Sequence, residues 1–498
     1  MRSIHYIERT SNSRVINIPK QLTVLGQLLL FEAFFMIAPL IVCICNRERD
    51  WIPFLCTIAI TALTGCSLKY LVKTESDSLG RKDGAMITCM VWIIFSLFGM
   101  LPFIFGSSHL NISEGFFETM SGFTTTGATV IREVEECSMG LVLWRAITQW
   151  IGGLGIVLFT LAIIPSLNNS KGVFMFHAEV SGITHDKIGA RIANTAKILW
   201  LLYGIITLIL ILLLWIGPMT LFESVCHAFA AISTGGYSTR NESIAAFDSL
   251  YIKLILSIFM FIGGVNFALI YSACRGYWKQ FWKNDVFRAF LALIGINYVV
   301  TLISILHSGN YGGWQSLTID PLFHIVSAMT STGFGAGNFE AWGELCLVLT
   351  IVMMYFGACA GSTTGGAKLD RLVYLFKNFR NEIKRAVSPR SMMALRVNGQ
   401  MITPENSNEI VAFLLIYTGL ILFGGILLSA LNFPIVDAFF SSISCVSNNG
   451  LGSGVTGITG SYDFLPDIGK WVMSFLMLAG RLEIFALIML LSPAFWRK

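Results

Sequence analysis

Charged residues are scarce in this chain, and their scarcity is the first constraint on what the protein can be. Of its 498 residues, only 13% are Asp, Glu, Lys or Arg, whereas 55% are hydrophobic. A soluble domain carries roughly a quarter charged residues, so the composition excludes a soluble globular enzyme. Apolar runs of about 20 residues, the length that a helix needs to cross a bilayer, recur along the chain. The sequence therefore predicts an all-α, polytopic membrane protein.

Residues that serve catalysis or hold metal clusters are also missing. The 11 cysteines form no CxxC pair and mostly lie inside apolar runs, where cysteine is a small packing residue. The sequence offers no nucleophile, metal-binding cluster or paired carboxylates at membrane depth. We therefore expect a protein that is not an enzyme. His227 and His324, at equivalent places in two short helices, are expected to pack rather than to bind metal.

About ten apolar runs are predicted to span the membrane, at 22–45, 52–72, 84–106, 139–166, 195–216, 250–273, 286–306, 341–367, 410–431 and 465–492. Most of the 34 Lys and Arg residues fall in alternate loops. Because basic loops remain in the cytoplasm, both termini are expected to be cytoplasmic, in a multi-pass protein of the cytoplasmic (inner) membrane. Acidic residues collect on the predicted outer side, which predicts an acidic mouth that attracts cations.

Four shorter stretches, each ending in a glycine-rich turn, align with one another without gaps. They are FETMSGFTTTGAT from Phe117, CHAFAAISTGGYS from Cys226, FHIVSAMTSTGFG from Phe323 and FSSISCVSNNGLG from Phe440. The shared glycines are Gly127, Gly236, Gly333 and Gly450. Each stretch is too short to span, and irregular backbone at membrane depth is tolerated where it lines a water-filled path. The repeat predicts four helix, pore-loop, helix units around one pore, preceded by an extra N-terminal helix pair.

A glycine in such a turn allows backbone angles that direct successive carbonyls to one axis. Four turns would then form rings of oxygens that replace the water shell of a dehydrated cation, as in the filter of potassium channels. None of the turns contains Asp, Glu, Lys or Arg, which excludes the carboxylate ring of a calcium filter. A single turn of this kind would favour tight helix packing as its role, but four equivalent turns favour a filter.

Each helix that follows a turn carries glycine about 25 to 30 residues after the shared glycine, which predicts kinks or close approaches. These glycines are Gly152, Gly153, Gly263, Gly264, Gly361 and Gly480. The strongest irregularity is the run Gly361, Ser362, Thr363, Thr364, Gly365 and Gly366. A nucleotide-binding P-loop requires Lys directly after its last glycine, but Ala367 stands there. We therefore expect a flexible loop across the permeation path, below the filter.

Arg481 lies inside the last apolar run, where a charge is costly and faces a partner or a water-filled route. A side chain that faces the pore is the favoured interpretation. The alternative is an ion pair with Glu483, which a separation of two residues disfavours because the side chains point to different helix faces. Arg145 and Lys253 are expected near helix ends, with their charged groups reaching the outer interface.

Five further motifs carry a resemblance to a known family: GRKDG from Gly80, QWIGGLGIV from Gln149, GGVNFAL from Gly263, GSTTGGAK from Gly361 and GRLE from Gly480. With the four turns, they resemble the TrkH branch of the Trk/Ktr/HKT potassium-uptake superfamily over nearly the whole chain. The resemblance implies that the loop from Gly361 to Gly366 is the gate. It also implies that K+ is held by the two residues before each shared glycine, namely Thr125, Thr126, Thr234, Gly235, Ser331, Thr332, Asn448 and Asn449.

The expected function is potassium uptake through this filter, gated by the intramembrane loop. The alternative is a potassium symporter coupled to protons or sodium, for which only Glu32, Arg481 and Glu483 qualify as buried titratable residues. The expected organisation is an N-terminal segment with two extra helices (1–80), pore unit 1 (81–168), pore unit 2 (190–275), pore unit 3 (284–368), a basic cytoplasmic linker (369–403) and pore unit 4 (404–498).

The basic linker predicts a partner on the cytoplasmic side. The basic residues in and beside it are Lys368, Arg371, Lys377, Arg380, Lys384, Arg385, Arg390 and Arg396. Anionic lipid attracts such a segment with about 1 kcal/mol for each basic residue near the surface. The resemblance implies a homodimer and a separate cytosolic, TrkA-like regulatory ring that binds NAD and ATP or ADP. No nucleotide is expected on this chain itself, and no nucleic acid as a partner.

Overall fold

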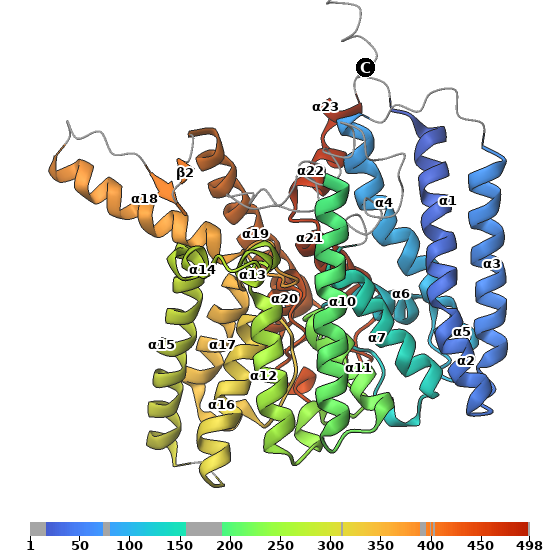
Figure 1. Ribbon diagram of the computed structural model, residues 1–498, viewed down its shortest axis with the longest axis horizontal. Helices are drawn as coiled ribbons and strands as arrows, with labels where there is room; N and C mark the ends of the chain where they lie inside the picture. Colours follow the sequence, from blue (N-terminus) through green and yellow to red (C-terminus); the bar gives the residue numbers. More distant parts are fainter. Residues whose placement is uncertain are drawn as a thin grey trace, which may run out of the picture.

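The protein is described here by a computed structural model that covers residues 16–72, 80–155, 192–309, 312–388, 395–398, 400–401 and 404–496. Most of this part is α-helix (Figure 1). Two short strands within it, β1 (Arg396–Val397) and β2 (Gln400–Met401), pair in antiparallel orientation. The predicted all-α fold is therefore confirmed.

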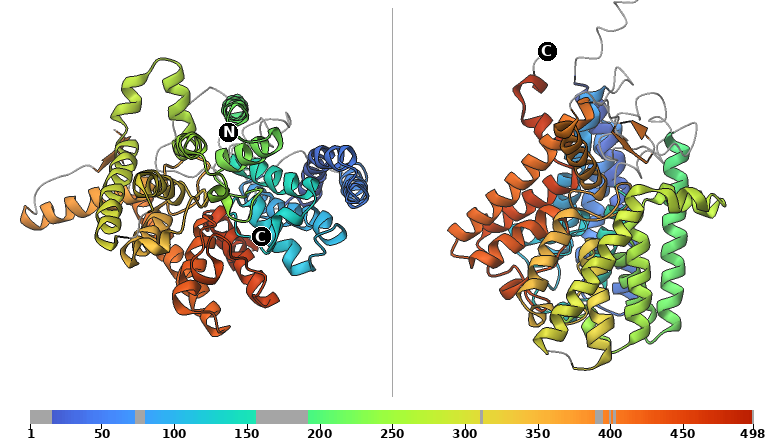
Figure 2. Two further views of the ribbon diagram at one scale, coloured as in Figure 1. Left: turned by 90° about the horizontal axis from the view of Figure 1, so that it is seen from below. Right: turned by 90° about the vertical axis from the view of Figure 1, so that its left-hand side faces the viewer.

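An extra helix pair lies at one side of the molecule (Figure 2). It consists of α1 (Ile18–Phe35), its continuation α2 (Ile37–Cys45) and α3 (Trp51–Tyr70). Small residues allow α1 and α3 to approach closely, because a Cβ added to Gly26 would lie 2.7 Å from the carbonyl oxygen of Gly65. The pair borders the first repeated unit, where α1 packs on α4.

Four repeated units come next along the chain, each with a first helix, a short pore helix and a second helix. The first unit comprises α4 (Arg81–Gly99), α5 (Leu101–Phe105), α6 (Ile112–Phe123) and α7 (Met139–Gly153). The second comprises α10 (Ile192–Ile216), α11 (Leu221–Ile232), α12 (Leu250–Gly264), α13 (Phe267–Cys274) and α14 (Trp278–Lys283). The third comprises α15 (Asp285–Ser308), α16 (Trp314–Met329) and α17 (Glu344–Phe356), and α18 (Leu369–Val387) follows it within the predicted basic linker. The fourth comprises α19 (Pro404–Ala430), α20 (Ile435–Ser447), α21 (Asp467–Arg481), α22 (Phe485–Leu491) and α23 (Pro493–Trp496).

The four units surround a common centre, as the view from below in Figure 2 shows. Contacts between second helices and neighbouring pore helices join successive units, with α7 on α11, α12 on α16, α17 on α20 and α21 on α6. Among the described residues, six helices are long and apolar enough to cross a membrane, and up to eight if each sharply bent helix pair is one span. This arrangement is that of a polytopic membrane protein with four repeats.

The pore helices α6, α11, α16 and α20 are too short to span, as predicted, and a polar side chain caps the start of the first two. Asn111 and Thr220 cap α6 and α11 by accepting hydrogen bonds from the backbone of Glu114 and Glu223. Each of those glutamates bonds back to the capping residue, which satisfies backbone donors that a helix start leaves free. The two pore helices therefore begin where a polar side chain meets the first free amides.

The second helices of the second and fourth units bend sharply beside the predicted glycines Gly263, Gly264 and Gly480. The pair α12 and α13 bends by 103° and the pair α21 and α22 bends by 115°. α7 ends at Gly153, and the rest of the predicted 139–166 span lies mostly outside the described residues. The predicted span at 341–367 is wrong in its second half, because α17 ends at Phe356 and a loop begins there.

Candidate functional site

The four turns that follow the pore helices have the same backbone conformation. The first residue of each predicted ion-binding pair has positive φ: 56° at Thr125, 54° at Thr234, 50° at Ser331 and 51° at Asn448. The shared glycines also have positive φ: 86° at Gly127, 78° at Gly236, 82° at Gly333 and 75° at Gly450. Left-handed residues alternating with others direct successive carbonyls to one side of the strand, instead of to alternate sides.

Each turn is anchored to its own pore helix by an equivalent hydrogen bond. The amide of the second residue of the pair donates to the carbonyl five residues earlier, at the small residue that the repeats share. These bonds are Thr126 to Ser121 (2.8 Å), Gly235 to Ala230 (2.8 Å), Thr332 to Ser327 (2.9 Å) and Asn449 to Ser444 (2.9 Å). The four turns are thus equivalent in structure as well as in sequence.

The turns form a closed ring in which each glycine faces the neighbouring turn. A Cβ added to Gly127 would lie 2.1 Å from the Gly235 carbonyl oxygen, and one added to Gly236 would lie 1.9 Å from that of Thr332. The corresponding distances are 2.0 Å from Gly333 to Asn449 and 2.2 Å from Gly450 to Thr126. The last contact returns to the first turn, so one chain closes the ring. In the fourth turn the residue at the shared position is Gly450, and not a glycine two residues later.

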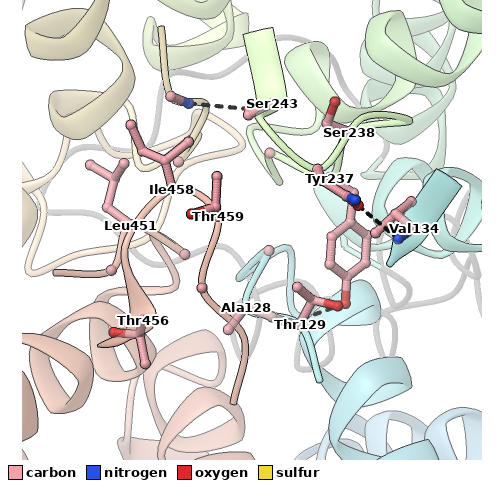
Figure 3. Close-up of a pocket in the computed structure, with 18 of the residues that line it drawn as sticks. Ala128, Thr129, Val134, Tyr237, Ser238, Ser243, Leu451, Thr456, Ile458 and Thr459 are labelled. Carbon is pink, nitrogen blue, oxygen red and sulfur yellow. Dashed lines mark hydrogen bonds between the residues drawn. The ribbon is translucent and has the colours of Figure 1, made fainter. Parts of the chain in front are cut away.

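A cavity of about 90 Å³ lies on the glycine side of the ring (Figure 3). All four units contribute to its lining, through the shared glycines and the segments that follow them. Among the described residues, that lining includes three arginines and no Asp or Glu, so the expected acidic mouth is not found there. The arginines form ion pairs with acids outside the lining, and the pairs are Arg132–Asp463, Arg145–Glu118 and Arg240–Glu223.

Asp463 illustrates how these acids stay ionised beside the mouth. Partial burial raises the pKa of its carboxyl, but hydrogen bonds from Ser461 and Arg132 outweigh that effect and hold the pKa below its ordinary value. The negative charge of Asp463 therefore offsets the positive charge of Arg132 at neutral pH. The pair of Arg132 and Asp463 therefore adds no net charge beside the cavity.

The segment from Gly357 to Lys368 forms a loop with its two ends together. Gly357 has φ of 67° and reverses the chain at the end of α17. The amide of Ala367 then donates to the Tyr355 carbonyl (3.0 Å), and the amide of Leu369 donates to the Ala358 carbonyl (2.9 Å). The predicted Gly361–Gly366 run is therefore the tip of a tightly closed loop.

The tip of this loop lies directly beneath the ring of turns. The hydroxyl of Thr234 donates to that of Thr363 (3.3 Å), and the Gly365 amide donates to the Ser331 hydroxyl (2.7 Å). A Cβ added to Gly365 would lie 2.0 Å from the Ser447 carbonyl oxygen. The loop thus contacts the second, third and fourth turns. Two of these contacts are to Thr234 and Ser331, the first residues of predicted ion-binding pairs.

Arg481 joins the loop to the first unit. Its guanidinium donates to the Thr363 carbonyl (3.0 Å) and to the carbonyls of Gly152 (2.5 Å) and Gly153 (2.8 Å) at the end of α7. A guanidinium is a rigid fork of donors, so it can hold several carbonyls in one arrangement. The charged side chain predicted to face the path therefore contacts the loop itself.

The alternative partner of Arg481 is engaged elsewhere. The Glu483 carboxylate accepts from Arg371, whose guanidinium lies over the Phe413 ring at 3.8 Å from its centroid. Both charged groups of that pair lie near the base of the loop, where α18 begins. Arg481 thus bonds Thr363, whereas Glu483 bonds Arg371, and a side chain of Arg481 that faces the pore stays a prediction.

Comparisons with known proteins identify the family of this chain. The sequence matches the family model "TrkH: Cation transport protein" over residues 53–498. The chain belongs to the TrkH family. Its members are transport proteins rather than enzymes, as expected from the sequence.

Similar proteins match this TrkH-family chain along nearly its whole length. The Trk system potassium uptake protein TrkH of Escherichia coli (strain K12) is 34% identical over 482 residues, covering 95% of this chain and 98% of that protein. TrkH of Vibrio parahaemolyticus is 32% identical over 480 residues, with the same coverage. The crystal structure of the potassium transporter TrkH from Vibrio parahaemolyticus superposes with a TM-score of 0.87 at 30% identity, covering 97% of this chain and 100% of that one.

Two basic residues of this TrkH-family chain do not lie where the sequence predicted. Arg145 is buried behind the first turn, where its guanidinium donates to Glu118 (2.8 Å), so the predicted reach to the outer interface is wrong. Lys253 lies near the start of α12 as expected, but its ammonium group binds Asp320 (2.7 Å) and is mostly buried. Position along a helix gives the depth of a side chain and not the neighbour that it faces.

One set of residues escaped the sequence interpretation although the repeats contain it. Each pore helix carries an acid at the same distance before the shared glycine, and the set is Glu114, Glu223, Asp320 and Asp437. Their partners are respectively Lys470 (2.8 Å), Arg240 (2.7 Å), Lys253 (2.7 Å) and the Ser453 hydroxyl (3.0 Å). Two of these bonds join neighbouring units. Extending the alignment of the turns toward their N-terminal side would have revealed the set.

Proposed function

We propose that this chain takes up K+ across the cytoplasmic membrane through the ring of four turns. The single observation that carries the proposal is the closure of that ring, with the same backbone conformation in all four turns. The names of its relatives, which are potassium uptake proteins, support K+ as the transported ion. An inward K+ gains about 2.3 kcal/mol for each 100 mV of membrane potential, so the potential can drive uptake.

The proposed filter uses backbone carbonyls and uncharged side chains. The proposed ion-binding positions are the two residues before each shared glycine, and the equivalent conformation of the four turns supports them. They are Thr125, Thr126, Thr234, Gly235, Ser331, Thr332, Asn448 and Asn449. Rings of carbonyl dipoles replace the hydration shell of a monovalent cation, and the ion has to bind weakly enough at each site to leave again. The ends of four pore helices add partial negative charge beneath the turns.

The proposed gate is the loop from Gly361 to Gly366, together with Arg481. The loop lies against the bases of the turns, so K+ that leaves the filter has to pass it. Arg481 fixes the loop to the end of α7 and adds a positive charge that opposes a cation. Opening then requires that the loop and Arg481 move apart.

A coupled symporter is the second candidate, and Glu32 is the observation that favours it. Glu32 is fully buried, and neither of its carboxylate oxygens has a hydrogen-bond partner among the described residues. It lies against α4, because a Cβ added to Gly99 would lie 3.1 Å from its Oε1 atom. Vesicles with a proton gradient and no membrane potential separate the two candidates. Accumulation of K+ that is lost in Glu32→Gln would favour the symporter.

We also propose that the chain works as a homodimer with a cytosolic regulatory ring, with both termini in the cytoplasm. The relatives are named as parts of a Trk system, which supports further components. The basic linker from 369 to 403 is the proposed contact for that ring and for anionic lipid. K+ is the transported ion, and nucleotide is proposed to bind the ring and not this chain.

Growth at limiting K+ tests the main proposal. Expression of the chain in a strain that lacks potassium uptake should restore growth, and the purified protein should carry K+ into vesicles that have an inside-negative potential. Sodium in place of K+ should give much less uptake. A well-folded protein that carries neither ion, or that carries both equally, would refute a potassium filter.

A further inference from the structure

The second position of the ion-binding pair differs among the turns in a way that the ring has to accommodate. Thr126 and Thr332 each share a hydrogen bond with a hydroxyl two residues earlier, both at 2.8 Å. The side-chain amide of Asn449 donates to the Ala328 carbonyl at 2.7 Å. These side chains brace three turns from behind. The second turn has Gly235 at this position and therefore has no side chain to do so.

Gln149 of α7 occupies the place where that side chain would be. A Cβ added to Gly235 would lie 2.4 Å from the Gln149 Cδ and 2.7 Å from both of its terminal amide atoms. The Gln149 Nε2 donates to the Gly235 carbonyl (2.6 Å), and its Oε1 accepts from the Tyr237 amide (3.1 Å). Gln149 is fully buried, so these bonds form away from water.

The same helix fixes the outer half of the second turn. Arg145, one helical turn before Gln149, lies over the Tyr237 ring at 4.0 Å from its centroid. The Tyr237 hydroxyl donates to the Glu118 carbonyl (2.8 Å), and the ring points toward Ala128 of the first turn (Figure 3). The second turn is therefore held by residues of the first unit, and Gln149 is the contact nearest to its ion-binding pair.

We infer that Gln149 is a positioning residue that determines ion selectivity, in place of the side chain that the second turn lacks. This inference rests on the proposed potassium filter. A carbonyl oxygen has two lone pairs, so the bond from Gln149 fixes the direction of the Gly235 carbonyl and leaves a lone pair for the ion. Because selectivity depends on the number and placement of coordinating carbonyls, one misdirected oxygen in four weakens it.

Replacing Gln149 separates positioning from packing. Gln149→Leu keeps most of the bulk of the side chain but removes both hydrogen bonds. Gln149→Glu keeps the acceptor for the Tyr237 amide but replaces the donor to Gly235 by a carboxylate oxygen, which also adds a negative charge beside the turn. Both variants should lower the ratio of K+ to Na+ flux in vesicles by about tenfold, which corresponds to about 1.4 kcal/mol. Gln21→Leu is the matched control, because Gln21 is also buried and bonds Asp83 (2.7 Å) in another part of the chain. It should leave the flux ratio unchanged.

A double substitution tests whether Gln149 and a side chain at position 235 occupy the same space. Gly235→Thr alone should disturb the turn, since its Cβ would meet Gln149. Combined with Gln149→Ala, the added threonine gains the vacated space and can brace its turn as Thr126 and Thr332 brace theirs. The double variant should therefore be more thermally stable and more selective than Gly235→Thr alone.

The outcomes decide between this inference and the proposed function. An unchanged flux ratio in a folded Gln149→Leu or Gln149→Glu protein would overturn the inference, as would a double variant no better than Gly235→Thr. A wild-type protein without preference for K+ would instead refute the proposed filter. In that case the melting temperature of the double variant, compared with that of Gly235→Thr, would still show whether Gln149 and a side chain at position 235 compete for the same space.

Discussion

Gly333 occupies a place in the ring that fits only glycine. Its φ of 82° is a conformation that costs other residues roughly 1–2 kcal/mol. A Cβ would also lie 2.0 Å from the Asn449 carbonyl oxygen, so the carbonyl would have to move. Gly333→Ala should therefore reduce the ratio of K+ to Na+ flux by an order of magnitude or more. Gly127→Ser should act alike, because Gly127 meets the Gly235 carbonyl in the same way.

Gly309 is a control that separates the cost of a positive φ from the displacement of a carbonyl in the ring. Gly309 also has positive φ, at 69°, but a Cβ there would meet no atom within 4 Å. Gly309→Ala should thus lower the melting temperature slightly and leave the ion ratio unchanged. Equal loss of selectivity in both variants, or no loss in Gly333→Ala, would contradict the role given to the four turns.

Individual residues were predictable from the sequence to the extent that the repeats defined them. The four shared glycines were found because four copies align, and each copy supports the others. Arg145 was misplaced because its partner, Glu118, lies in another helix and nothing in the sequence pairs them. Gln149 gave no signal of its own either. The absent side chain at Gly235 was visible in the alignment, but only the structure shows which residue replaces it.

At the scale of elements, the loop beneath the ring and the helices that meet it form one device. Arg481 donates to the loop at Thr363 and to the end of α7 at Gly153. Hydrogen bonds from a charged donor contribute about 1.5–3 kcal/mol each, so their loss should favour an open loop. Arg481→Ala should accordingly raise K+ flux several-fold, up to about tenfold for each 1.4 kcal/mol lost by the closed state.

Selectivity and stability reveal whether this effect arises at the gate. The ratio of K+ to Na+ flux should stay the same in Arg481→Ala, because the turns are untouched. Arg481→Lys retains the charge but not the fork of donors, so its flux should lie between those of wild type and Arg481→Ala. Reduced flux together with a lower melting temperature would identify Arg481 as a structural residue instead.

The elements themselves were predicted unevenly. Hydropathy located the first helices of the units, since these are long and apolar. The second helices were harder, because glycine indicates a break without fixing the bend angle or the path of the chain beyond it. The bends of 103° and 115° and the end of α17 at Phe356 come from packing against the turns and the loop. Sequence periodicity does not contain those contacts.

At the scale of the whole molecule, one chain closes the ring of turns, so the proposed partner is not required to complete it. The loop passes directly into α18, which projects from the bundle in Figure 1. Near its start, the Asp370 carboxylate accepts from the Ala360 amide of the loop (2.7 Å). A partner that moves α18 is therefore able to move the loop, provided that its affinity differs between the closed and open states.

The exposed basic residues of α18 are the place to test this partner. Lys377 is not a suitable target, because it binds Asp285 (2.6 Å) within the chain, whereas Arg380 and Lys384 are exposed. Arg380→Gln with Lys384→Gln should weaken binding of the cytosolic ring and reduce nucleotide control of flux, with the ion ratio unchanged. The expected loss is about 1–2 kcal/mol, or roughly tenfold in affinity, for two charges at a partly hydrated surface.

A control has to show that weaker ring binding comes from the position of the charges on α18, and not from the loss of two positive charges alone. Lys279→Gln with Lys283→Gln removes the same charge from α14, on the same predicted face, and should leave ring binding intact. Both double variants are compared in one fixed lipid mixture, because anionic lipid attracts either pair of basic residues. Undiminished binding in the α18 variant would leave lipid as the supported partner of α18. Equal weakening in both variants would indicate general attraction to the basic face and no specific contact at α18.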